Sequence, residues 1–168
     1  MRLVAISVWF QLLWFLAVLG QSHYQVWLFA LVVASYVWLM TLGKHFLSQA
    51  VAFSVVGVLV DSLNQAGGLF IFPSHFIPLW LVALWFAFGW YANLMAARLS
   101  TLPHLVVIAL GAMGGALSYF AGVKFGAVEW GIPFMTTFII LMIEWALLTS
   151  LILFASKKEW FSNQYVNN

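Results

Sequence analysis

Two acidic residues stand inside long apolar stretches of this sequence, where carboxyl groups are rare. Asp61 lies late in a stretch over residues 47–66, about 20 Å along a helix from its start. Glu144 lies near the middle of a stretch over residues 133–155, about 16 Å from either end. An unpaired carboxylate at membrane depth costs several kcal/mol, so each acid is a candidate catalytic residue. The structural alternatives are a helix cap or an ion pair with Lys124 for Asp61, and interhelical hydrogen bonding for Glu144.

The polar neighbours of these acids are candidate ligand-binding residues. Asn64 follows Asp61 by three residues, which places both on one helix face. In the stretch over residues 78–97, Trp85 and Asn93 share a face and are expected to look into a helical bundle. They could bind a ligand, or they could form an aromatic core with a buried amide that joins helices.

Acids in an apolar cavity can act as general acid and base. We expect Asp61, Asn64 and Glu144 to line one such cavity, with Glu144 facing Asn93, a hydroxyl group or water. Lys124 is a further candidate ligand-binding residue, since it falls on the same side of the membrane as Asp61.

No other catalytic or cofactor-binding motif stands out. The sequence lacks His-Glu-x-x-His, Gly-x-Ser-x-Gly, phosphate-loop and dinucleotide-binding patterns. Its four histidines contain no pair at a spacing of four, so we assign no metal ligand and expect no cofactor: His23, His45, His75 and His104.

Small residues in the stretch over residues 103–123, and just after it, form a candidate helix-packing face. Four of them recur at steps of four and predict a single stripe that lets another helix approach closely. A groove kept narrow for a lipid tail or ligand is the alternative. The six residues are Gly111, Gly114, Gly115, Ser118, Gly122 and Gly126.

Composition defines the elements that must position these residues. Of 168 residues, 65% are hydrophobic and 6% are charged, whereas about a quarter are charged in a soluble domain. Such a chain cannot cover a water-exposed surface, so we predict an all-α transmembrane bundle forming a single domain over residues 1–168. The absence of cysteine excludes disulfides, thiolate metal sites and cysteine nucleophiles. The scattered basic residues give no indication of nucleic-acid binding.

Polar and turn-rich breaks divide the sequence into six predicted spans. The first is expected to be a membrane span rather than a cleaved signal peptide, because a small-residue cleavage site is missing. Residues 67–77 interrupt the pattern with two glycines and a proline and could form a re-entrant or interfacial segment. The spans are 3–20, 26–43, 47–66, 78–97, 103–123 and 133–155.

Basic residues predict the orientation of the spans. Five of the six fall in breaks on one side of the predicted bundle, and the positive-inside rule places that side in the cytoplasm. We therefore expect a multi-pass protein of a bacterial inner membrane, with both termini cytoplasmic. The five residues are Arg2, Lys44, Arg98, Lys157 and Lys158.

Three sequence blocks resemble a known family. Residues 57–63, 78–88 and 111–128 are similar, in this order, to bacterial inner-membrane proteins of the family called domain of unknown function 2878. Ala116 departs from the proline expected after the glycine pair. The resemblance implies a polytopic helical fold and a genomic association with lipid-modifying enzymes, such as proteins similar to cyclopropane-fatty-acid synthase. It implies no established activity.

Three functions remain open. The first is an enzyme or accessory subunit in membrane-lipid modification. The second is a small-molecule binding or transport subunit that resembles the substrate-binding subunits of energy-coupling-factor transporters. The third is a non-catalytic membrane scaffold. The expected partners are membrane lipids, together with another membrane protein or a second copy of the chain.

Overall fold

The protein is an all-α bundle. The computed structural model describes the backbone of residues 2–166 and the side chains of residues 3–96 and 98–156. Within this part of the chain, six helices coincide with the six predicted spans, and most of their ends lie within three residues of the predicted ones. They are α1 (Arg2–Gly20), α2 (Gln25–Met40), α3 (Lys44–Ala66), α4 (Leu79–Leu99), α5 (His104–Lys124) and α6 (Phe134–Val166).

The bundle has the outer surface of a multi-pass membrane protein. Five of the described helices are long and apolar enough to cross a membrane, whereas α2 has only 16 residues. Large apolar side chains point outward: Leu105 is 82% exposed, Val26 74% and Phe154 70%. Because this surface would be unfavourable in water, its natural surroundings are lipid chains.

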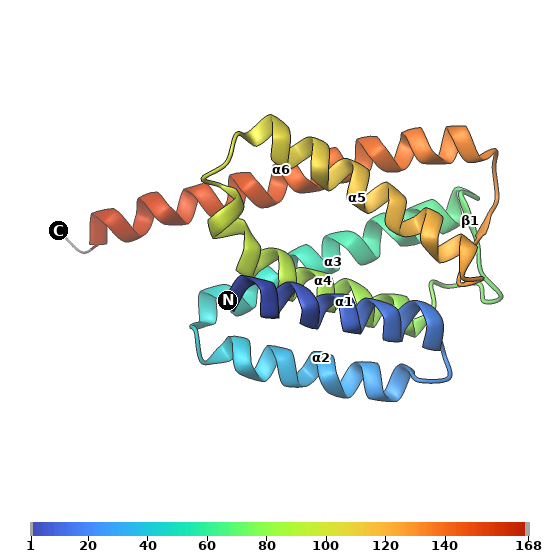
Figure 1. The fold of residues 1–168 in the computed structure, drawn as a ribbon, viewed down its shortest axis with the longest axis horizontal. Helices are drawn as coiled ribbons and strands as arrows, with labels where there is room; N and C mark the ends of the chain where they lie inside the picture. Colours follow the sequence, from blue (N-terminus) through green and yellow to red (C-terminus); the bar gives the residue numbers. More distant parts are fainter. Residues whose placement is uncertain (1, 167–168) are drawn as a thin grey trace.

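Helix α4 is the centre of the bundle. In its most apolar window 61% of the residues are buried, against 22–28% for the other four long helices. It contacts α1, α2, α3 and α6, while α5 packs chiefly on α6. Figure 1 shows the result: α1 and α2 lie at one side of α4, and α5 and α6 lie at the other.

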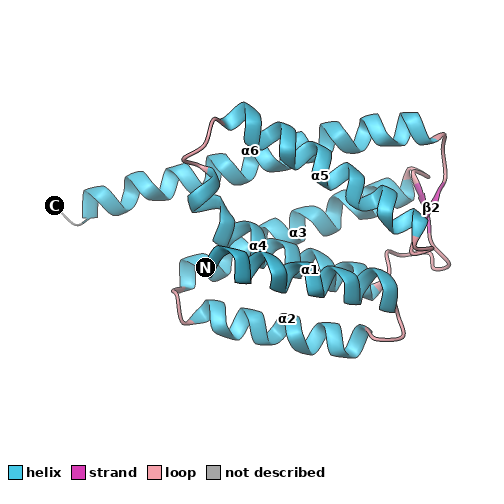
Figure 2. Cartoon of the chain, viewed as in Figure 1, coloured by secondary structure: helices cyan, strands magenta, loops and turns pink. Residues whose placement is uncertain are grey.

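The two ends of the bundle differ. Both termini and the α2–α3 and α4–α5 connections lie at one end, which we call the terminal end, and the short strands lie at the opposite end (Figures 1 and 2). Lys44 begins α3 and Arg98 lies in the last turn of α4, so both belong to the terminal end, as predicted.

Residues 67–77 form a turn, a strand and a loop at the strand end of the bundle. Strand β1 (Phe70–Ile71) pairs antiparallel with β2 (Glu129–Trp130), and Phe70 stands opposite Trp130. Gly131 permits this pairing, because a Cβ atom there would lie 2.0 Å from the carbonyl oxygen of Gly68. The strands thereby join the α3–α4 connection to the α5–α6 connection.

Candidate functional site

A fully buried carboxyl group lies where α3, α4 and α5 meet. Asp61 is 0% exposed. Its Oδ2 atom accepts a 2.6 Å hydrogen bond from Nε1 of Trp85, and its Oδ1 atom accepts one of 2.6 Å from the hydroxyl group of Tyr119. Hydrogen bonds of this kind offset the cost of removing a carboxyl group from water.

The alternative that Asp61 pairs with Lys124 is wrong. Lys124 is exposed at the end of α5, where its Nζ atom lies 5.4 Å from the centroid of the Phe120 ring. Asp61 is therefore stabilised by an indole and a phenol, without a cation from this side chain.

Aromatic packing holds both donors in place. A Cβ atom at Gly57 would lie 1.9 Å from the ring of Trp85, so the glycine makes room for the indole beside α3. Trp85 also stacks on Trp145 of α6, with centroids 5.5 Å apart. Tyr119 stacks on Phe70 of β1 at 5.0 Å. The strand pair thus supports the phenol that binds Asp61.

Glu144 bonds to α3 rather than to Asn93. Its Oε2 atom accepts a 2.9 Å hydrogen bond from Nδ2 of Asn64, which follows Asp61 by three residues on α3. Asn93 instead donates a 2.8 Å bond to Oε1 of Gln49. Of the partners considered for Glu144, Asn93 is therefore wrong, and the hydrogen-bond donor is Asn64.

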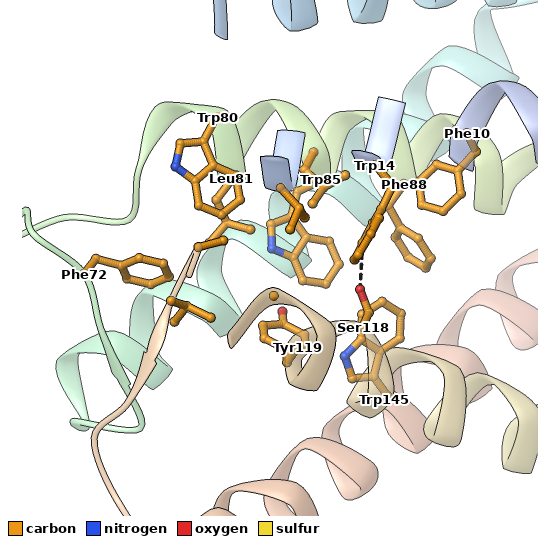
Figure 3. A pocket seen from close by; sticks show the side chains of 15 residues that line it. Phe10, Trp14, Phe72, Trp80, Leu81, Trp85, Phe88, Ser118, Tyr119 and Trp145 are labelled. Carbon is orange, nitrogen blue, oxygen red and sulfur yellow. Dashed lines mark hydrogen bonds between the residues drawn. The ribbon is translucent and has the colours of Figure 1, made fainter. Parts of the chain in front are cut away.

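A small aromatic cavity of about 70 Å³ lies beside the Asp61 donors. Trp85 and Tyr119 form part of its wall (Figure 3). Among the described residues that line it, Tyr119 alone carries a titratable group. Trp14 of α1 closes one side and donates a 2.8 Å hydrogen bond to Oγ of Ser118, drawn as the dashed line in Figure 3.

A wider groove of about 570 Å³ adjoins this cavity. It runs between α1, α4, α5 and α6 toward the terminal end, where Leu99 and Leu102 line it. Its few polar side chains include Gln11 and Thr149. Five lining residues are common to the cavity and the groove: Phe10, Trp14, Phe88, Ser118 and Trp145.

Glu144 faces a separate groove. This third space, about 250 Å³, lies between α3 and α6, and Trp145 is the residue that it shares with the other two. Asp61 and Asn64 are not among the described lining residues of any of the three. The expectation that Asp61, Asn64 and Glu144 line one cavity is therefore wrong: Asp61 reaches the aromatic cavity through its donors, and Glu144 faces away from it.

The small residues of α5 divide into two faces. A Cβ atom at Gly111 would lie 2.2 Å from Oγ1 of Thr149, and one at Gly115 would lie 2.0 Å from the ring of Trp145. These two glycines allow α6 to pack closely against α5. Gly114 is exposed and has no such neighbour within 4 Å, so it lies outside that contact.

The rest of the predicted stripe serves other contacts. Ser118 bonds to Trp14, and buried Gly122 lies beside Val128. Gly126 follows α5 in a turn with a φ of +70°, and its carbonyl oxygen accepts a bond from Gln21. A single packing stripe through 114, 118, 122 and 126 is therefore wrong, since its members face different neighbours.

Sequence reasoning missed Tyr119 and Gln49. Each supplies the partner that a singled-out residue needed, a donor for Asp61 and an acceptor for Asn93. The available signal was a hydrogen-bonding group at comparable depth on another predicted span. Tyrosine in an apolar helix is common enough that this signal picks out no single partner.

The family of this protein follows from comparisons with known proteins. Residues 3–151 match the sequence profile described as protein of unknown function (DUF2878). Neither curated proteins nor solved structures give a match. Since the matched segment covers most of the chain, from α1 into α6, this protein belongs to the DUF2878 family.

Proposed function

We propose that this protein acts in membrane-lipid modification by holding an apolar lipid chain beside the Asp61–Tyr119 pair. The observation that carries the proposal is the groove of about 570 Å³ that adjoins the aromatic cavity. Its volume is in the range of ligand sites, and its walls are almost entirely apolar. The chain of a lipid fits that chemistry better than a polar solute does.

Tyr119 is the group that would act on the bound chain. It lines the cavity, while its hydroxyl group donates to a carboxyl group that is shielded from the surroundings. A phenol hydrogen-bonded to a carboxylate can act as a general base: an acidic group on the lipid, such as a hydroxyl, passes its proton to the phenol oxygen while the phenol passes its own proton to Asp61. Trp85 positions Asp61 for this role.

The proposal includes a location. A bacterial inner membrane with the terminal end in the cytoplasm fits the basic residues that gather at that end. Lipid chains would then reach the groove sideways from the membrane, between helices. In this setting the proposed partners are the lipids themselves and the enzyme that shares them.

Quantitative lipid mass spectrometry tests the proposal. A strain without the protein should lack a lipid species that returns with the wild-type chain and fails to return with Asp61→Asn or Tyr119→Phe. Glu129→Gln is the matched control, because Glu129 is an exposed acid on β2. An unchanged lipid profile in the deletion strain, or full recovery with both variants at normal protein level, would refute the proposal.

A binding subunit and a scaffold are the competing functions. A solute-binding subunit predicts a tightly held small polar molecule in the purified protein. A scaffold predicts that crosslinking captures a stable protein partner while the lipid profile stays unchanged. The lipid measurement therefore separates lipid modification from the other two functions. The bound molecule and the crosslinking then distinguish a binding subunit from a scaffold.

A further inference from the structure

The groove between α3 and α6 combines one acid with apolar walls. Its described lining residues are Val56, Val60 and Leu63 of α3 and Glu144, Trp145, Leu147, Leu148 and Leu151 of α6. Among these, Glu144 alone can carry a charge. Leu63 is 71% exposed and Leu147 is 66% exposed. The groove therefore opens to the surroundings of the bundle rather than toward its core.

The carboxyl group of Glu144 is fixed but has room for another partner. Its Oε2 atom accepts the bond from Asn64, which is itself buried. A carboxylate can accept about four hydrogen bonds, so one amide donor leaves acceptor capacity. The side chain of Glu144 is half-buried. The described part of the chain places no lysine or arginine among the lining residues.

In its ionised form, the carboxyl group of Glu144 calls for a cation from outside the protein. An ionised carboxyl group at membrane depth is costly unless a partner neutralises it. A hydrophilic cation would not leave water for a groove with leucine and valine walls. A cation with a large apolar body satisfies both demands, since its charge meets Glu144 and its body covers the aliphatic side chains.

We propose that the α3–α6 groove is a binding site for a lipophilic cation, such as a hydrophobic amine or phosphonium, with Glu144 as its counter-ion. Asn64 is a positioning residue that orients the carboxyl group. Leu148 and Leu151, one and two turns further along α6, contact the apolar body of the ligand. The site is separate from the groove of about 570 Å³, because Trp145 lies between the two spaces. It therefore does not depend on the proposed function.

Binding of radiolabelled tetraphenylphosphonium to the purified full-length protein in a non-ionic detergent tests this site. The wild-type protein should bind the cation saturably, and Glu144→Gln should weaken binding at least about tenfold, since one partner of a desolvated charge pair is lost. Glutamine retains an oxygen that can accept from Asn64. The control Glu129→Gln removes the same charge from β2, far along the chain from the groove, and should bind as the wild type does.

Two further measurements make the test specific. Tetraphenylborate has the same shape and the opposite charge, so it should not compete for the site. Leu151→Trp retains Glu144 and fills the groove, so it should also abolish binding, with folding checked by size-exclusion chromatography and thermal unfolding. No saturable binding by the wild type, equal affinity in Glu144→Gln, or equal binding of tetraphenylborate would each overturn the proposal.

Discussion

Tyr119 on α5 places its hydroxyl oxygen 2.6 Å from Oδ1 of Asp61 on α3, although 58 residues separate them in the chain. The bond connects α5, which lines both the aromatic cavity and the groove of about 570 Å³, with an acid that lines neither. A change at either residue should therefore alter the cavity as well as the stability of the bundle. The following predictions test this arrangement and the packing around it.

Removal of the indole donor should destabilise the bundle. Trp85→Phe keeps an aromatic ring beside Gly57 but leaves Oδ2 of Asp61 without its 2.6 Å bond. We expect a loss of about 1–3 kcal/mol in the free energy of unfolding, because a buried polar group loses a partner. Trp80→Phe is the control: Trp80 is also buried on α4, but it is not a donor to Asp61. Equal losses in both variants would contradict the assigned role of Trp85.

Methyl groups on α5 should have position-dependent effects. Gly115→Ala would place a Cβ atom 2.0 Å from the ring of Trp145, so α5 and α6 must separate or the indole must move. Overpacking of this kind costs about 1–3 kcal/mol. Gly114→Ala meets nothing within 4 Å and should be neutral or slightly stabilising. Thermal unfolding of the two purified variants measures the difference, and a destabilised Gly114→Ala would favour a partner helix on that face.

The contact of α1 with α5 should be weakened by Ser118→Ala. This change removes the acceptor of the 2.8 Å bond from Trp14. We expect a small loss of about 0.6 kcal/mol, the average for side-chain hydrogen bonds between membrane helices. Ser62→Ala is the matched control, because Ser62 bonds to the carbonyl oxygen of Val58 in its own helix. The distribution of distances between spin labels on α1 and α5 should broaden in Ser118→Ala and stay unchanged in the control.

Removal of the Lys124 charge should have little effect on the stability of the protein. Lys124→Gln leaves both hydrogen bonds to the carboxyl group in place, because Lys124 lies over the ring of Phe120 and not beside Asp61. We expect the melting temperature to remain within about one degree of the wild type, as for an isolated surface charge. A loss of stability as large as that of Trp85→Phe would support an ion pair between Asp61 and Lys124.

The sequence predicted the helices well because span formation depends on local properties. Each apolar stretch must satisfy its own backbone hydrogen bonds in lipid, and helix formation achieves this without reference to the rest of the chain. Residues 133–155, for example, correspond to the part of α6 that begins at Phe134. Trp85 and Asn93 were expected from their helix face to look into the bundle, and both are buried.

The hydrogen-bond partners on neighbouring helices could not be predicted from the sequence in this way. Lys124 was one alternative partner for Asp61, and Asn93 was one of the partners considered for Glu144, because both pairings join plausible polar groups. In the structure, Asp61 accepts a hydrogen bond from Tyr119, and Glu144 accepts one from Asn64. Which groups meet depends on the rotation and height of each helix relative to its neighbours, and those are set by side-chain packing over the whole bundle.

By itself, the sequence determined the membrane class, the six helices, the family and the acids that require partners. Only the tertiary structure decided that Trp145 separates Glu144 from the groove between α1, α4, α5 and α6, and that α6 packs against Gly111 and Gly115 rather than Gly114. The physical reason is that hydropathy is a property of a single segment, whereas the walls of a cavity come from four helices at once.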